Sequence, residues 1–317
     1  MRIPSSIILT HSVALVNSFK GTLEVTAMAK IFLADQYLKK VAADDIMRII
    51  NSNEVRIMAF IELHYHSDVL MHGVTVNVVL PENAKTLIGM GGAASAEYKT
   101  LYLLHGLSDD QTIWMRRTSI ERYASERGIA VVMPTVLRSW YTDTADGAAY
   151  LKFITEELPS VCRGYFRGMS AKREDNFIAG LSMGGYGAIK AAFTHPEVFG
   201  GCATLSGALD IASLDRIFNI NEWRGIFGFG LEGARELKGS KHDVFALVEN
   251  AAKEGIIMPK IYSWCGESDW LFECNNRFSA LLSELGIEHK YEVSEGDHSW
   301  KWWDMHIQDA MDHLLRG

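Results

Sequence analysis

Short apolar runs and segments of helical period alternate through most of this chain. Residues 60–65 and 74–80 alternate apolar and polar side chains, as half-buried antiparallel strands do. Nearly continuous apolar runs, typical of strands buried on both faces of a parallel sheet, follow at 101–104, 129–133, 177–179, 200–205, 260–265 and 291–293. Helical patterns lie between or after them at 120–127, 148–158, 188–194, 271–285 and 300–315. We therefore predict an α/β protein with a mostly parallel central sheet and helices on both faces.

Two segments stand outside this alternation. Residues 1–57 contain an amphipathic helical pattern at 34–51, but no strand–turn–helix order connects them to the rest of the chain. Residues 206–254 form a longer connection than a simple crossover needs, so part of them is expected to cap a site or to pack beside it. The predicted organisation is an N-terminal extension over 1–57 and one α/β domain over 58–317.

Composition and charge argue against several classes of protein. The 317 residues carry a formal net charge of −8 without a cluster of Lys and Arg, which argues against nucleic-acid and anionic-membrane partners. No apolar run approaches the roughly 20 residues of a membrane span, and polar residues at 10–12 interrupt the stretch that a secretory signal would require. The four cysteines lack metal-ligand spacing. Cys202 and Cys265 fall in strand-like runs, where we interpret them as core residues.

The segment 180–184 reads Gly-Leu-Ser-Met-Gly and lies between a strand pattern and a helix pattern. A nucleophile on such a sharp strand-to-helix turn needs small neighbours at both glycine positions, because the turn brings the strand and the helix into close approach. The turn exposes the serine oxygen at the carboxyl end of the sheet, and the helix N-terminus favours negative charge developing there. Ser182 is therefore the predicted nucleophile.

An acid and a base should follow the nucleophile in that order. Asp269, after the apolar run 260–265, is the predicted acid, and the nearby Glu267 is its competitor, otherwise a solvated loop carboxylate. His298, after the last strand pattern, is the predicted base, and Asp297 beside it is expected to cap the final helix. The remaining candidate histidines are interpreted as surface or helical residues: His195, His242, His289, His306 and His313.

His105 and Gly106 directly follow the predicted strand at 101–104. In hydrolases with a nucleophile turn of this kind, the loop at this position supplies one amide of the oxyanion hole. We assign the oxyanion hole to the backbone N–H groups of Leu107 and Met183. His105 is expected to organise this loop through hydrogen bonds rather than to carry protons.

Aromatic residues lie near the predicted site in the sequence. Trp140, Tyr141, Trp270 and Trp300 could either pack the core or line an apolar pocket. We assign substrate-binding roles to Trp140, Tyr141 and Trp300.

Several motifs together resemble the esterase D-like family of α/β hydrolases, and most of all its bacterial tributyrin esterases. These motifs are LLHGLSDDQTIWMRRTSIERYA (103–124), RSWYTDT (138–144), GLSMGGYGA (180–188), GESD (266–269) and GDHSWKWWD (296–304). The resemblance implies a cytoplasmic carboxylesterase with no metal or organic cofactor, whose partner is a small-molecule ester with a short acyl chain. It places Ser182, Asp269 and His298 at the triad positions and Leu107 and Met183 at the oxyanion amides. Because family members commonly begin near residue 58, translation is expected to start at Met58.

Departures from related branches leave other readings open. S-formylglutathione hydrolases carry histidine at the positions of Leu181 and Tyr186, which favours carboxylic esters here. A thioesterase of that type, an acyltransferase similar to the mycolyltransferases and a catalytically silent binding protein remain alternatives. The oligomeric state is also open, a homo-oligomer included.

Overall fold

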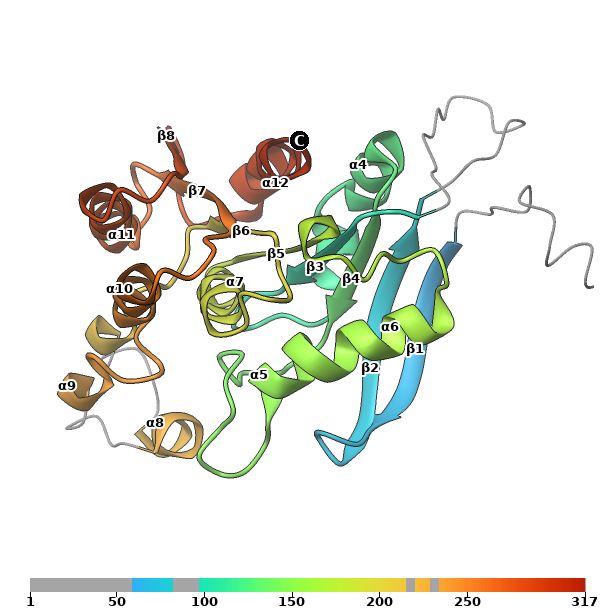
Figure 1. The fold of residues 1–317 in the computed structure, drawn as a ribbon, viewed down its shortest axis with the longest axis horizontal. Coiled ribbons are helices and arrows are strands. Elements are labelled where there is room, and N and C mark those ends of the chain that lie inside the picture. Colours follow the sequence, from blue (N-terminus) through green and yellow to red (C-terminus); the bar gives the residue numbers. More distant parts are fainter. Residues whose placement is uncertain (1–58, 82–96, 215–219, 229–233, 317) are drawn as a thin grey trace, which may run out of the picture. The chain divides into compact units, whose positions relative to one another are not determined.

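An eight-stranded sheet forms the centre of the fold (Figure 1). The computed structural model describes residues 59–81, 97–214, 220–228 and 234–316. The strand order is β1-β2-β4-β3-β5-β6-β7-β8. The strands are β1 (Ala59–Ser67), β2 (His72–Leu80), β3 (Thr100–Leu104), β4 (Ala130–Pro134), β5 (Asn176–Leu181), β6 (Gly201–Leu205), β7 (Lys260–Gly266) and β8 (Lys290–Ser294). The expected extension 1–57, its helix at 34–51 and the expected start at Met58 lie outside the described residues.

Strand direction follows the two kinds of hydrophobic pattern. β2 pairs antiparallel with β1 and with β4, whereas all pairs from β4 to β8 are parallel. Every residue of β3, β5 and β6 is buried, as the continuous apolar runs require, while β1 alternates partly buried and exposed side chains over most of its length. The predicted fold class, a mostly parallel sheet of the α/β-hydrolase type, is confirmed.

Helices cover both faces of the sheet and bury two separate apolar clusters (Figure 1). One face carries α3 (Ile113–Arg117), α4 (Ile120–Arg127) and α12 (Trp300–Leu315). The other face carries α5 (Tyr150–Lys152), a π-helical turn (Phe153–Glu157), α6 (Leu158–Tyr165), α7 (Met183–Thr194), α10 (Val244–Glu254) and α11 (Phe272–Glu284). Among the described helices, none is both long and apolar enough to cross a membrane.

Two helices differ from the sequence prediction for physical reasons. α7 begins at Met183 rather than near 188, because its first turns contain Gly184, Gly185 and Gly187, and glycine weakens a helical signal. The helix predicted at 148–158 continues through a π-helical turn to Tyr165. The long connection at 206–254 contains a 3-10 turn (Ile211–Ser213), α8 (Ile220–Phe227), α9 (Ala234–Leu237) and α10.

Candidate active site

Ser182 occupies a strained turn between β5 and α7. Its φ of 52° and ψ of −117° lie in a region that L residues rarely adopt, so surrounding contacts must hold it there. The Ser182 N–H donates to the carbonyl of Leu205 at 3.0 Å, and its carbonyl accepts the N–H groups of Tyr186 and Ala208 at 3.1 Å. These bonds fix the turn through the backbone, which leaves the hydroxyl free for chemistry.

The two glycines of the motif are required by close approach. A Cβ atom on Gly180 would lie 2.4 Å from the backbone carbon of Gly184. A Cβ atom on Gly184 would lie 2.6 Å from the carbonyl oxygen of Leu104 at the end of β3. Real Cβ atoms do not approach backbone so closely, so the elbow can form only with glycine at both positions.

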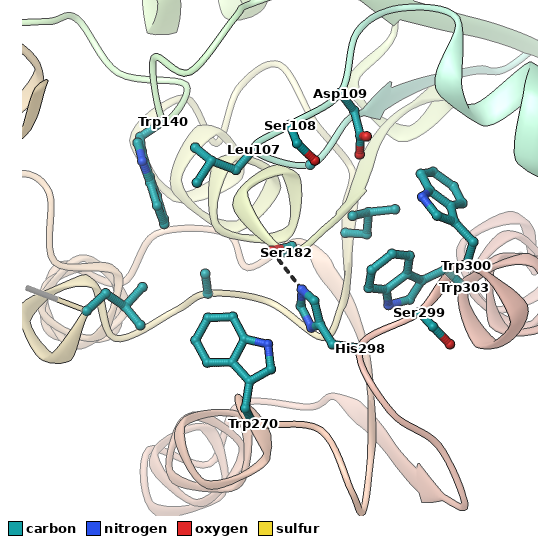
Figure 2. Close-up of a pocket in the computed structure, with 14 residues that line it drawn as sticks. Leu107, Ser108, Asp109, Trp140, Ser182, Trp270, His298, Ser299, Trp300 and Trp303 are labelled. Atoms are coloured by element: carbon teal, nitrogen blue, oxygen red, sulfur yellow. Dashed lines mark hydrogen bonds between the residues drawn. The ribbon is translucent and has the colours of Figure 1, made fainter. Parts of the chain in front are cut away.

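The structure brings Ser182, His298 and Asp269 into one hydrogen-bonded array (Figure 2). His298 Nε2 lies 3.1 Å from Ser182 Oγ, and His298 Nδ1 lies 2.9 and 3.1 Å from the two carboxylate oxygens of Asp269. A carboxylate only accepts hydrogen bonds, so Nδ1 carries the proton and Nε2 is left as the acceptor facing the serine hydroxyl. This tautomer is the one in which histidine can take a proton from serine.

The buried carboxylate of the array is Asp269 and not its competitor. The Asp269 side chain is 0% exposed and also accepts the backbone N–H of Leu271 at 2.9 Å, whereas Glu267 is exposed. The expected role of Asp297 as a helix cap is wrong. Ser299 stands at the N-terminus of α12 with no side-chain cap, and Asp297 accepts the hydroxyl of Ser299 instead.

The loop after β3 is organised by His105, as the sequence predicts. Its Nδ1–H donates to the Gly106 carbonyl at 2.7 Å, and its Nε2 accepts the N–H of Val136 at 3.1 Å. Both nitrogens are therefore used in the neutral form, and burial lowers the pKa of the ring. Leu107 lines the pocket, and Met183 begins α7 directly after Ser182. Within the described residues, the N–H groups of Leu107 and Met183 have no protein acceptor.

The array opens into a pocket of about 450 Å³ at the carboxyl end of the sheet. Figure 2 shows Trp140 on one side of Ser182 and His298, with Asp109 and Trp300 toward the other. The residues that line it are Gly106, Leu107, Ser108, Asp109, Trp140, Leu181, Ser182, Ala208, Leu214, Trp270, His298, Ser299, Trp300 and Trp303. Ala208 and Leu214 come from the long connection after β6, part of which was expected to cap the site.

The three predicted substrate-binding aromatics are not equivalent. Trp140 and Trp300 line the pocket, although Trp140 is only 2% exposed. Tyr141 is fully buried and is not brought to the pocket. Its hydroxyl donates to the His105 carbonyl at 2.9 Å, and its ring packs against Gly187 of α7. Tyr141 therefore supports the loop after β3 from behind, in place of the substrate contact assigned to it.

Two further tryptophans hold the ring of His298. Trp303 packs edge-to-face on it at 4.9 Å between ring centroids, and Trp270 lies 5.2 Å from it on the open side, 55% exposed. The Nε1–H of Trp303 donates to Ser206 Oγ at 3.0 Å, which anchors the indole beside the imidazole. Sequence reasoning did not single out Trp303, although it lies one helical turn after Ser299 in the aromatic run that follows His298.

A buried histidine lies outside the site and corrects one prediction. The sequence predicts a surface or helical position for His242, yet it is 4% exposed, and its Nδ1 lies 3.1 Å from Nζ of Lys190 on α7. Burial and the neighbouring lysine lower the pKa of His242 to about 3, and burial lowers the pKa of Lys190 to about 7. Lys190 also donates to the hydroxyl of Thr142, and Tyr186 donates to the His242 carbonyl. The cluster ties α7 to the chain before α10.

Glu292, His306 and Asp309 are a group with metal-ligating atoms in the described part of the chain, within 4.8 Å of one another. Their atoms already have protein partners. Glu292 accepts the hydroxyl of Tyr262 at 2.5 Å, and His306 pairs with Asp309 at 2.9 Å. None of the three residues lines the pocket beside the Ser182 array.

Comparisons with known proteins agree with this geometry. A family model described as putative esterase matches residues 67–314. An acetyl esterase of Caldicellulosiruptor saccharolyticus is 32% identical over 268 residues, which cover 82% of this chain and 99% of the relative.

Two solved structures from Staphylococcus aureus are similar to the chain over their whole length. The fluorophosphonate-binding serine hydrolase FphF has a TM-score of 0.74 at 36% identity, covering 82% of this chain and 99% of its own. The S-formylglutathione hydrolase FrmB has a TM-score of 0.72 at 36% identity, covering 82% and 100%. The chain thus belongs to this esterase family and is a serine hydrolase of the α/β-hydrolase fold that acts on ester bonds.

Proposed function

We propose that the protein is a carboxylesterase that hydrolyses short-chain acyl esters through Ser182, His298 and Asp269. The observation that carries the proposal is the hydrogen-bonded array from Asp269 through His298 to Ser182, at the wall of an aromatic pocket. Tributyrin, acetyl esters and p-nitrophenyl esters are the proposed substrates. The buried free thiols of all four cysteines support a cytoplasmic location.

The proposed reaction has two steps. His298 Nε2 takes the proton of Ser182 Oγ as this oxygen attacks the ester carbonyl, and the same proton passes to the leaving alcohol as the acyl-enzyme forms. Water then attacks the acyl-enzyme with His298 as base, which releases the acid and restores Ser182. Asp269 holds the Nδ1–H tautomer and stabilises the charged imidazole. The N–H groups of Leu107 and Met183 stabilise the oxyanion in both steps.

Acyl-chain length tests the substrate class. We expect kcat/KM on p-nitrophenyl esters to be highest for acetate and butyrate and to fall by about 10-fold or more at octanoate, because tryptophans bound a pocket of about 450 Å³. In a pocket long enough for the whole chain, each additional buried methylene would instead stabilise the bound ester by about 0.8 kcal/mol. A continuous rise in kcat/KM through octanoate would contradict the short-chain assignment.

Thioester hydrolysis is the second candidate, favoured by the 36% identity to FrmB. Rates on S-formylglutathione and on p-nitrophenyl acetate, measured with the same enzyme preparation, separate the two. We expect the carboxylic ester to be preferred, since no lysine or arginine is among the lining residues to receive the two carboxylates of glutathione. A kcat/KM for S-formylglutathione that exceeds the acetate value by 100-fold would assign the thioesterase activity instead.

Trp303 is proposed as a positioning residue for His298. Trp303→Phe keeps an aromatic ring beside the imidazole but removes the hydrogen bond to Ser206, and Ser206→Ala removes the same bond from the other side. We expect each to lower kcat by roughly 3- to 10-fold, the equivalent of about one hydrogen bond, with little change in KM. The double variant should be no slower than the slower single one, because both lose one interaction. Additive losses of kcat in the double variant would show that Trp303 and Ser206 do not act through their shared hydrogen bond.

A further inference from the structure

Asp109 is an acidic side chain in the wall of the pocket that the proposed mechanism does not use. Among the residues that line the pocket, it is the only one with a carboxyl group, and none is a lysine or an arginine. His298 is the other ionisable lining residue, and its Nδ1–H is already paired with Asp269. A negative charge therefore faces the bound substrate without a cationic partner in the wall.

The carboxylate of Asp109 is held close to the loop that carries Leu107. The backbone N–H of Asp109 donates to the Gly106 carbonyl at 3.2 Å. A Cβ atom on Gly106 would lie only 2.9 Å from Asp109 Oδ2. Asp109 forms no ion pair with a described residue, whereas the carboxylates of Asp210 and Glu222 each pair with an arginine. Burial raises the pKa of the half-buried carboxyl, opposed by His105 and by hydrogen bonds from Gly106 and Ser108.

The pocket has two unlike sides. Figure 2 shows Asp109 near Trp300 on one side of the Ser182–His298 pair, with Trp140 on the opposite side. Two serines also line the pocket: Ser108, the neighbour of Asp109 in the chain, and Ser299, whose hydroxyl donates to Asp297. The rest of the wall away from Ser182, His298 and the loop after β3 is apolar. It consists of Ala208, Leu214 and the four tryptophans. Charge in the wall is thus confined to one side.

We infer that Asp109 makes the site select its substrates by charge. It disfavours esters that carry an anionic group near the reacting carbonyl and favours neutral or cationic esters. The inference rests on the proposed ester hydrolysis at Ser182 and narrows its substrate class. We take about 8 Å between Asp109 and an anionic group of the substrate, and an effective dielectric constant of about 20–40. The repulsion between the two charges should then lower kcat/KM by roughly 5- to 30-fold.

Three aryl acetates of similar shape test this inference at pH 8. They are 4-acetoxybenzoate (anionic), methyl 4-acetoxybenzoate (neutral) and 4-acetoxyphenyltrimethylammonium (cationic). Each kcat/KM is divided by the rate constant for hydroxide hydrolysis of the same ester, which removes differences in leaving-group reactivity. For the wild-type protein we expect the corrected values to rise from the anionic to the neutral to the cationic ester. The reverse order would overturn the inference without any variant.

Asp109→Asn removes the charge and keeps the size and the hydrogen-bond acceptor. We expect it to raise the anionic-to-neutral ratio of kcat/KM about 10-fold and to lower the cationic-to-neutral ratio. Asp110→Asn is the matched control, because it makes the same charge change one residue away, where the carboxylate accepts two hydrogen bonds from Thr112 and does not line the pocket. Its ratios should stay within about 2-fold of the wild type.

The outcomes separate the two proposals. Unchanged ratios in an active Asp109→Asn protein, or equal shifts in the Asp110→Asn control, would overturn the role of Asp109 and leave ester hydrolysis standing. A purely structural role of Asp109 would lower all three rates together and leave the ratios unchanged. A wild-type protein that hydrolyses none of the three acetates would overturn both proposals. If Asp109→Asn does not fold, Asp109→Ser and the wild-type order decide the question.

Discussion

Replacing Ser182 by alanine is expected to lower kcat on p-nitrophenyl butyrate by about 10⁴-fold or more, since loss of a triad serine removes the acyl-enzyme route. The fold should persist. The backbone of Ser182 makes the bonds that fix the turn, and alanine meets the same strain at a φ of 52° as serine does. Turnover and the midpoint of thermal unfolding, measured on the same sample, check both parts.

The control for this variant is Ser299→Ala, a pocket-lining serine on the neighbouring loop whose hydroxyl donates to Asp297. We expect it to retain activity within about 10-fold, because it carries no proposed chemical role and loses about one exposed hydrogen bond. A Ser182→Ala protein that keeps its fold and more than a tenth of wild-type turnover would remove Ser182 from the mechanism.

Asp269→Asn is expected to lower kcat by about 10³- to 10⁴-fold with the fold retained. The amide nitrogen of asparagine can donate to His298 Nδ1 and so favours the tautomer with its proton on Nε2. In that tautomer Nε2 faces the Ser182 hydroxyl with a hydrogen and cannot take the serine proton. The loss should appear in kcat rather than in KM, because the substrate does not touch this buried carboxylate.

Glu267→Gln provides the matched control two residues earlier, since Glu267 is an exposed carboxylate on the same loop. It should retain activity within about 2-fold. Equal losses in the two variants would mean that general negative charge on this loop matters, and not the bond from Asp269 to His298.

The sequence was most informative where physical constraints are local. The elbow at 180–184 requires glycine on both sides of Ser182, and the structure shows why, with backbone atoms 2.4–2.6 Å from where Cβ atoms would be. The order of Ser182, Asp269 and His298 was also readable, because the parallel sheet brings the carboxyl ends of β5, β7 and β8 to one edge. The apolar runs of those strands predicted that arrangement directly.

Side-chain direction was less readable, because it depends on tertiary packing. Trp140 and Tyr141 are adjacent and both have positive φ, yet the first lines the pocket and the second points to His105. The burial of His242 against Lys190 of α7 depends on a contact between distant parts of the chain, which the local sequence does not show. Asp297 precedes the helical pattern as a cap would, but α12 begins at Trp300, three residues later, and Ser299 occupies the N-cap position.

The central claim is that Ser182 is the nucleophile of an ester hydrolase, and covalent labelling tests it most directly. The protein would be treated with a fluorophosphonate, with and without prior p-nitrophenyl butyrate, and the modified residue located by peptide mass spectrometry. The proposal predicts one adduct, on Ser182, which forms as activity is lost. The ester should slow its formation. The adduct should be absent from Ser182→Ala and should form much more slowly in Asp269→Asn. Inactivation with the adduct on another residue, or full activity with Ser182 stoichiometrically modified, would contradict it.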